Sequence, residues 1–219
     1  MIIEMTTQPG LRERKKQQTR ELIAEAAWRL FAERGFHGVT VAEVARAADV
    51  SEATVFNYFP TKEDLVYGRM EAFEEELLRA VRERAPGESV LAAFGRFALV
   101  PRGLLASKDA DAAERLVTIS RVITSSPALV ARETQIFARY TQSLARLIAE
   151  ETGALADDVE PWVAANALMG VHRALIDYVR RRILSGRRTT GLARDVRAQG
   201  ERALALLEAG LGDYAVKKR

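Results

Sequence analysis

Residues 51–58 combine short polar side chains with a spacing that places them on the outside of a short helix. Thr54 and Asn57 carry a hydroxyl and an amide, with Ala53 and Tyr58 on the surfaces beside them. Short hydroxyl and amide side chains on an exposed helix can reach base edges in the major groove of DNA. The same stretch can also be an ordinary corner between two helices, since such corners are common in helical proteins.

Two short helices must position these side chains. Thr40 and Glu43 have the spacing of a capping box, in which the threonine covers a backbone N–H and the glutamate reaches back. The first helix then runs to about Ala48, and Ser51 caps a second helix that ends before Pro60. Two short helices joined by a tight turn predict a helix-turn-helix.

The apolar residues of this stretch indicate how the two helices pack. Val44 and Ala45 are expected to face inward on the first helix, where the small Ala45 permits a close crossing. Val50 fills the turn, and Val55 anchors the second helix. Asp49 stands beside Val50 in the turn.

A longer helix is predicted before this motif, at Thr19–Arg34. Its apolar residues recur every three or four positions from Leu22 onward, which gives the helix one apolar face. Gly35 suits the left-handed position that follows a helix end, and Phe36 is then expected to fold back on Phe31.

The rest of the chain also has the period of helices. No alternation of apolar and polar residues persists that would indicate a strand. The sequence therefore predicts an all-α protein. Further helices are predicted at 61–84, 88–100, 110–124, 127–152, 158–185 and 190–212.

Composition excludes several classes of function. The 219 residues include no cysteine and two histidines, which excludes a disulfide scaffold, a Cys-type zinc site and a thiol nucleophile. Phosphate-binding glycine loops and nucleophile-elbow motifs are absent from the sequence, so we expect no enzyme, no cofactor and no metal. With no signal peptide or long apolar segment visible, a cytoplasmic protein without membrane contact is expected.

The motif residues resemble the N-terminal domain of the TetR (tetracycline-repressor) family of bacterial regulators. The resemblance covers about residues 15–70 and rests on Thr40-Val-Ala-Glu-Val-Ala, Asp49-Val-Ser and Thr54-Val-Phe-Asn-Tyr-Phe-Pro-Thr-Lys-Glu-Asp-Leu65. It implies a three-helix helix-turn-helix DNA-binding domain followed by a helical-bundle domain for effector binding and dimerisation. The expected boundaries are a flexible tail at 1–11, the two domains at 12–66 and 67–214, and a frayed tail at 215–219.

The resemblance also implies which residues contact DNA. Helix N-termini and basic side chains would hold phosphates, because free N–H groups and positive charge attract anions there. The basic segment 12–16 would reach the backbone or a minor groove, or is simply a solvated arm. The expected phosphate or groove contacts are Arg20, Thr40, Ser51, Tyr58 and Lys62, and the expected base contacts are Ala53, Thr54 and Asn57.

Three positions depart from the family pattern. Asp49 and Ala53 stand where glycine is common, and Phe56 stands where tyrosine is common. Aspartate tolerates the left-handed backbone conformation better than most residues, so the turn is expected to keep its shape at Asp49. Because it lacks the hydroxyl, Phe56 is expected in the core rather than at DNA, whereas Ala53 can touch a thymine methyl group. These departures leave the preferred operator open.

The C-terminal domain is implied to bind an effector and to pair two subunits. Small and apolar residues in 158–185 and 190–212 can form a four-helix interface across a two-fold axis, or else the core of a single-chain bundle. Aromatic and polar residues at helical spacing are the expected pocket, although such stripes are often plain core. The expected lining is Phe94, Phe97, Arg121, Phe137, Tyr140, Trp162, Asn166, Met169, His172 and Arg173.

These observations favour a homodimeric one-component regulator, a repressor released from a palindromic operator in double-stranded DNA by a small-molecule effector. The helix expected at 61–84 would connect the two domains and transmit the effect of the ligand. Two alternatives stay open. An architectural DNA-binding protein would have no cavity in its C-terminal domain, and an all-α enzyme would need converging titratable groups.

Overall fold

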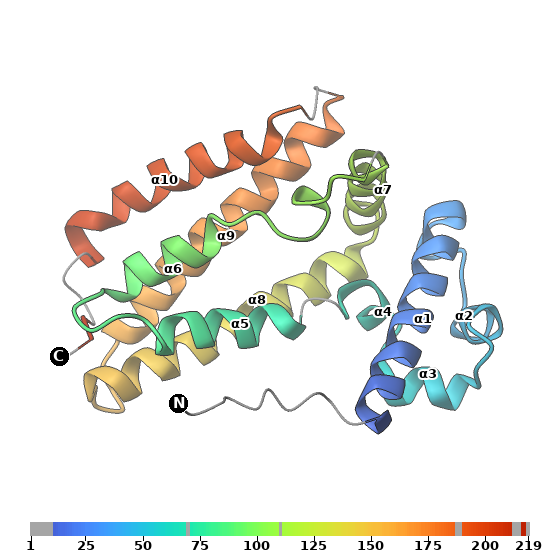
Figure 1. The fold of residues 1–219 in the computed structure, drawn as a ribbon, viewed down its shortest axis with the longest axis horizontal. Helices are drawn as coiled ribbons and strands as arrows, with labels where there is room; N and C mark the ends of the chain where they lie inside the picture. Colours follow the sequence, from blue (N-terminus) through green and yellow to red (C-terminus); the bar gives the residue numbers. More distant parts are fainter. Residues whose placement is uncertain (1–10, 69–70, 110, 187–189, 212–215, 218–219) are drawn as a thin grey trace, which may run out of the picture. The chain divides into compact units, whose positions relative to one another are not determined.

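The computed structural model describes residues 11–68, 71–109, 111–186, 190–211 and 216–217. Throughout these residues the regular structure is helical and no strand occurs, as the sequence predicts (Figure 1). The chain divides into two compact units, Met1–Arg69 and Met70–Arg219. The tails expected at the two ends are in part wrong. The first helix already begins at Leu11, and the backbone of Lys217 is hydrogen-bonded to Gly87 (2.7 Å) and Glu88 (3.2 Å). The other tail residues, apart from Val216, lie outside the described residues.

The first unit consists of α1 (Leu11–Arg34), α2 (Val41–Ala47), α3 (Glu52–Tyr58) and the single turn α4 (Asp64–Tyr67). Helix α1 packs against α2 and α4, and α2 packs against α3. Apolar residues from all four helices meet in one core, as their burial requires. The members of that core include Ile23, Ala27, Phe31, Val44, Ala45, Val55 and Leu65.

Two left-handed residues set the turns of this unit, and both are at the predicted positions. Gly35 has φ +73°, and the rings of Phe31 and Phe36 then meet with their centroids 5.3 Å apart. Asp49 has φ +54° between α2 and α3. The turn therefore keeps its shape with an aspartate, a residue that can adopt this conformation.

Three predictions for this unit are wrong. Helix α1 begins at Leu11 rather than at Thr19, so the basic segment 12–16, expected as an arm, belongs to the helix. Leu22, expected on the inner face of α1, is exposed. The single helix expected over 61–84 is interrupted, because α4 ends at Tyr67. At the break, the carbonyl of Gly68 accepts a hydrogen bond from Nη2 of Arg20 (3.1 Å). A Cβ at Gly68 would stand 2.3 Å from the ring of Phe59, so the close packing at this point requires glycine.

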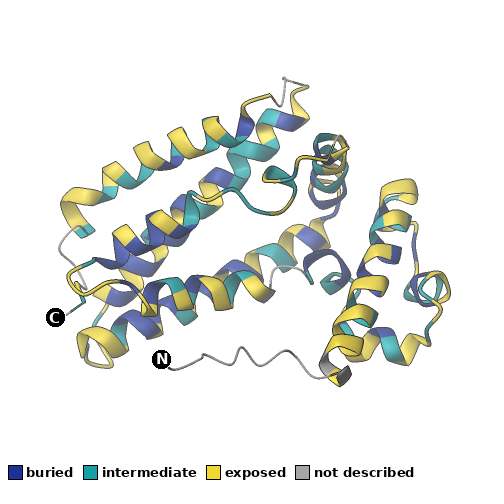
Figure 2. Cartoon of the chain, viewed as in Figure 1, coloured by how far each residue is buried: buried dark blue, intermediate teal, exposed yellow. Residues whose placement is uncertain are grey.

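The second unit contains α5 (Glu71–Arg82), α6 (Val90–Ala98), the 3₁₀ turn η1 (Gly103–Leu105), α7 (Ala112–Thr124), α8 (Pro127–Thr152), α9 (Glu160–Leu184) and α10 (Leu192–Leu211). From α6 onward, each predicted helix lies within about two residues of the observed one, the usual uncertainty of a helix end. Helix α9 packs along α8 and α10, and α10 also contacts α6 (Figure 1). Buried residues alternate with exposed ones along α8 and α9, and α6 is largely buried, whereas the buried residues of α10 are Leu192 and Gly200 (Figure 2).

A buried arginine that the sequence analysis did not single out joins two parts of this unit. The side chain of Arg84 is 2% exposed and donates to the carbonyls of Val81 (2.7 Å) and Glu88 (3.1 Å). Its guanidinium also pairs with the carboxylate of Glu151, at 2.5 Å. Burying this charge is tolerated because carbonyls and a carboxylate satisfy it. The end of α5 is thereby fixed to the end of α8.

Candidate functional site

Helix α3 presents one exposed face. Its inward anchor is Val55, while Glu52, Ala53, Phe56 and Asn57 are exposed. These four residues lie at i, i+1, i+4 and i+5, which places them together on one side of a helix. The face therefore combines an amide, a carboxylate, a methyl group and an aromatic ring.

Phe56 corrects the sequence-based expectation of a core residue, since its side chain is 47% exposed. The inward positions are taken by Val55 and by Phe59, one helical turn later. Successive residues on a helix differ by about 100° in direction, so Phe56 cannot share their face. The loss of a hydroxyl thus leaves an apolar ring on the surface of α3.

Side-chain caps fix the starts of α2 and α3. The backbone N–H of Thr40 donates to Glu43 (2.7 Å), and the N–H of Glu43 donates to the hydroxyl of Thr40 (3.3 Å), which is the predicted capping box. The Ser51 hydroxyl accepts from the N–H of Thr54 (3.0 Å) and lies 2.8 Å from the Thr54 hydroxyl. The hydroxyls of Ser51 and Thr54 therefore already have a partner in each other.

An arginine reinforces the capping box at α2. Nη1 of Arg34 lies 2.8 Å from the carboxylate of Glu43. This hydrogen bond, together with those from the backbone and the hydroxyl of Thr40, lowers the pKa of Glu43 to about 2. The carboxylate consequently stays ionised and keeps its hydrogen bonds to Thr40 at the start of the helix.

Two basic residues expected at DNA also hold the first unit together. Nζ of Lys62 donates to the carbonyl of Phe36 (2.6 Å), and burial there lowers the pKa of Lys62. Nη1 of Arg20 donates to the carbonyl of Tyr58 (3.3 Å), and its guanidinium lies over the ring of Phe59. Each therefore has a structural role, whatever it contributes at DNA.

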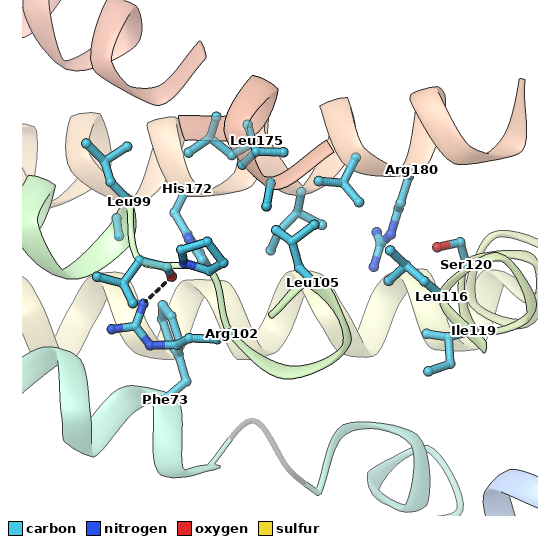
Figure 3. Close-up of a pocket in the computed structure, with 17 residues that line it drawn as sticks. Phe73, Leu99, Arg102, Leu105, Leu116, Ile119, Ser120, His172, Leu175 and Arg180 are labelled. Carbon is cyan, nitrogen blue, oxygen red and sulfur yellow. Dashed lines mark hydrogen bonds between the residues drawn. The ribbon is translucent and has the colours of Figure 1, made fainter. Parts of the chain in front are cut away.

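The second unit contains a cavity of about 270 Å³. Residues of α5, α7, α9 and α10 and of the segment from Ala98 to Leu105 line it. Most of the lining is aliphatic, and four described lining residues are polar (Figure 3). These four are Arg102, Ser120, His172 and Arg180.

The polar groups lie at two ends of the cavity, with Leu105 between them (Figure 3). At one end the imidazole of His172 stacks on the ring of Phe73, with centroids 4.5 Å apart and planes 20° from parallel. Burial, and then the charge of Arg102, lower the pKa of His172 to about 4. His172 is therefore neutral near pH 7 and can both donate and accept a hydrogen bond.

The two arginines differ in how their charge is balanced. Two nitrogens of Arg180 bind both carboxylate oxygens of Glu133, and both of these side chains are largely buried. Nη1 of Arg102 instead donates to the carbonyls of Phe97 (2.5 Å) and Val100 (3.0 Å). A carboxylate of Glu76 stands 3.7 Å from Nε of Arg102, in a partly exposed and hence weak ion pair.

Comparison with known proteins gives the family. The family model "Bacterial regulatory proteins, tetR family" matches residues 23–67, and the model "MftR C-terminal domain" matches residues 85–212. The chain belongs to the TetR family. It is a transcriptional regulator with a helix-turn-helix DNA-binding domain.

Individual relatives agree with this assignment. This TetR-family chain is 30% identical to the regulator TcmR of Streptomyces glaucescens over 156 residues, which cover 70% of this chain and 69% of TcmR. It is 26% identical to the mycofactocin biosynthesis regulator MftR of Mycobacterium tuberculosis over 165 residues, covering 72% and 78% of the two chains. The structure of GusR from Salmonella enterica has the same fold, with a TM-score of 0.54, 21% identity and coverage of 89% and 96%.

Within this TetR-family chain, the residues expected to line the pocket take three different places. His172 lines the cavity, and the rings of Phe97, Phe137 and Tyr140 lie in contact with Phe73 or His172 beneath it. Phe94 and Met169 are buried in the core. The exposed members, outside the cavity, are Arg121, Trp162, Asn166 and Arg173.

The expected residues of α9 that lie outside the cavity belong to a different face of the helix. On α9 the cavity is lined by His172, Leu175, Ile176, Val179 and Arg180, which repeat at three and four residues. Trp162, Asn166 and Arg173 belong to a second face, rotated around the same helix. Periodicity identified the two stripes of α9 but could not tell which one faces inward.

Arg102 and Phe73 are the functional candidates that sequence reasoning missed. Arg102 stands between Pro101 and Gly103, which mark a helix break, and a break carries no periodic signal. Phe73 lies in a helix rich in charged residues. None of the described helices is both long and apolar enough to cross a membrane.

Proposed function

We propose that this regulator is a repressor whose affinity for its operator falls when a small, largely apolar molecule occupies the cavity. The observation that carries the proposal is the cavity itself, in the same chain as a DNA-binding helix-turn-helix. An architectural DNA-binding protein needs no such space, and an enzyme needs converging titratable groups. The lining instead offers a neutral histidine, a hydroxyl and two arginines.

At DNA, the exposed face of α3 would enter the major groove. Ala53, Thr54 and Asn57 would contact base edges, and Phe56 adds an apolar group that suits a thymine methyl. The phosphate contacts expected of Thr40, Ser51, Tyr58, Lys62 and Arg20 are part of the same proposal. Phosphate contacts supply most of the affinity, and base contacts supply the specificity.

A homodimer is proposed to form through α9 and α10. On α9 the exposed residues Trp162, Val163, Asn166, Gly170 and Arg173 recur at one to four positions along one face. A Cβ at Gly170 would meet open space, so another helix can approach closely here. On α10, Leu206 is 84% exposed. An apolar stripe with small residues is typical of a helix–helix interface.

Dimerisation would have a direct consequence for DNA recognition. Two helix-turn-helix units related by a two-fold axis read two half-sites about 34 Å apart, one turn of the duplex. The operator would therefore be an inverted repeat. Selection of bound duplexes from a random pool tests this: an enriched inverted repeat supports the proposal, whereas sequence-independent binding contradicts it. Sedimentation should give twice the 24.3 kDa chain mass.

The effector half of the proposal is tested with a neutral apolar dye, N-phenyl-1-naphthylamine. The dye should bind at one molecule per chain and lower affinity for the selected duplex about 5–150-fold, the usual range of allosteric coupling. Val179→Trp, which fills the cavity, should abolish both effects, and Ala193→Met should weaken them. Circular dichroism checks that both variants fold. Saturating dye with unchanged DNA affinity would contradict the proposal.

A further inference from the structure

The polar groups of the cavity disfavour one class of ligand by charge. The described residues that line it include no aspartate and no glutamate, while two arginines are present. A cationic ligand would therefore find no negative charge in the described lining to offset the desolvation of its own charge. Neutral and anionic ligands are the classes that the lining leaves open.

One of the two arginines has its charge already balanced. Arg180 is bound through two nitrogens by Glu133, and the side chains of both residues are about one-seventh exposed, at 15% and 13%. A bidentate pair of this kind satisfies the guanidinium. The end of the cavity at Arg180 and Ser120 therefore carries no net charge and suits an uncharged part of a ligand.

The other arginine is held in place but is not neutralised in this way. Two backbone carbonyls accept from Nη1 of Arg102, and the guanidinium carbon lies 3.8 Å from the ring centre of Phe97. These contacts fix the direction of the side chain. The single acidic neighbour, among described residues with a contact to Arg102, is Glu76 at 3.7 Å, with 47% of its side chain exposed. Solvent screens a pair this open.

His172 completes this end of the cavity. Stacking on Phe73 and an edge contact with Phe137 (centroids 5.9 Å apart) fix its ring. Among the described residues, none forms a hydrogen bond with the imidazole of His172. A bound molecule can therefore supply the missing hydrogen bond at the point where the arginine supplies the charge.

We infer that the cavity takes an apolar carboxylic acid, with the carboxylate at Arg102 and His172 and the apolar body along the aliphatic wall toward Leu105 and Val179. The inference rests on the proposed effector function and names the chemical class of its ligand. An arginine fork recognises a carboxylate better than any neutral group of the same size. The aliphatic lining provides the remaining affinity by apolar burial.

The test uses probes that share an apolar body and differ in a small end group that is anionic, neutral or cationic. Calorimetry on the full chain compares naphthalene-2-carboxylate, naphthalene-2-carboxamide and 2-naphthylmethylamine, and then decanoate with decanamide. The carboxylate should bind about tenfold or more tightly than its amide, as expected for a hydrogen bond to a charged group. Among the three naphthalene probes, the amine should bind most weakly. An amide that binds as tightly as its acid, or no binding of any probe, overturns the inference.

Variants locate the carboxylate. Arg102→Met should abolish the preference for acid over amide while amide affinity is retained, and Arg102→Lys should keep part of the preference. His172→Phe preserves the stack on Phe73 and should weaken acid binding. Arg121→Gln, an exposed arginine on α7 outside the cavity, is the matched control and should bind every probe like the wild type. An acid preference that survives Arg102→Met would contradict the placement.

The outcomes separate the ligand class from the proposed function. An acid that binds preferentially but leaves affinity for the selected duplex unchanged would support the class and contradict effector control. Release of DNA by the neutral dye, combined with equal binding of acid and amide, would support effector control and contradict the ligand class. Thermal denaturation of each variant without a probe shows that the fold is intact before binding is compared.

Discussion

The ammonium nitrogen of Lys62 lies 2.6 Å from the carbonyl oxygen of Phe36 and 4.2 Å from the centre of the ring of the same residue. This contact joins the segment before α4 to the turn after α1. A lysine expected to hold a DNA phosphate thus also contributes to the stability of the DNA-binding unit. Its substitution should consequently alter two independent measurements.

Lys62→Ala should destabilise the first unit by about 1 kcal/mol, the usual net value of one hydrogen bond. The variant should also bind every DNA sequence more weakly by about the same factor. For the selected duplex, the slope of log K against log salt should fall in magnitude by about 1. Urea denaturation and salt titrations measure the two effects. Lys108→Ala, at an exposed lysine of the second unit, is the control. A changed sequence preference at constant salt slope would refute the phosphate contact.

Glu43 should make the stability of the first unit depend on acid. The pKa of Glu43 is about 2 in the folded chain, below its ordinary value of 4.5, because Arg34 and Thr40 bind the ionised form. Its stabilising contribution is therefore complete above pH 4.5 and is lost as pH falls toward 2. Glu43→Gln should have a lower free energy of unfolding than the wild type at pH 6, and this difference should shrink as pH falls toward 2. Denaturation at pH 6 and pH 2.5 measures the gap, and an equal gap at both would contradict the assignment.

Phe56 and Phe59 should respond oppositely to truncation. Phe59 is buried, so Phe59→Ala should cost about 3–5 kcal/mol, whereas exposed Phe56→Ala should change stability by less than about 0.5 kcal/mol. At DNA the order reverses, because Phe56 lies on the exposed face of α3. Replacing thymine by uracil in the selected duplex removes the methyl group. This change should lower the DNA affinity of the wild type more than it lowers the DNA affinity of Phe56→Ala. A large stability loss in Phe56→Ala would restore a core role.

The sequence predicts this fold well where local chemistry determines it. Helix α8 begins and ends at the predicted residues because Ser126 and Pro127 form a start signal and Gly153 a left-handed end. The end of α4 at Tyr67 was not predicted, and the contacts made there are long-range ones, such as the hydrogen bond between Arg20 and Gly68, 48 residues apart. Helical period alone gives no such long-range partner.

The candidate site was less predictable for the same reason. On α3 one expectation was wrong, because Phe56 was assigned to the core for its missing hydroxyl. A seven-residue helix offers too few positions for periodicity to correct such an assignment. The expected lining of the cavity needed more corrections. Its charged end includes Arg102, which lies in a loop, and a face of α9 that is determined by packing against other helices. His172 was included in the expected lining because it lies at helical spacing from Met169, on one stripe of the helix predicted at 158–185.

Neutral His172 should make the second unit sensitive to mild acid. The folded pKa of about 4 lies below the ordinary 6.5, because burial and then the charge of Arg102 disfavour the imidazolium. The groups facing it are the rings of Phe73 and Phe137 and the guanidinium of Arg102, with Glu76 behind that guanidinium. No carboxylate in the described lining stabilises the protonated ring.

Protonation of His172 consequently favours the unfolded chain, so stability is complete above pH 6.5 and declines as pH falls toward 4. The decline attributable to His172 is on the order of 3 kcal/mol, at about 1.36 kcal/mol for each unit of pKa difference between 6.5 and about 4. His172→Phe keeps the ring stack and should lose less stability than the wild type between pH 7 and pH 4.5. His37→Gln, at the exposed second histidine, should behave like the wild type. Identical acid profiles for the wild type and His172→Phe would show that the imidazole is not held neutral by its surroundings.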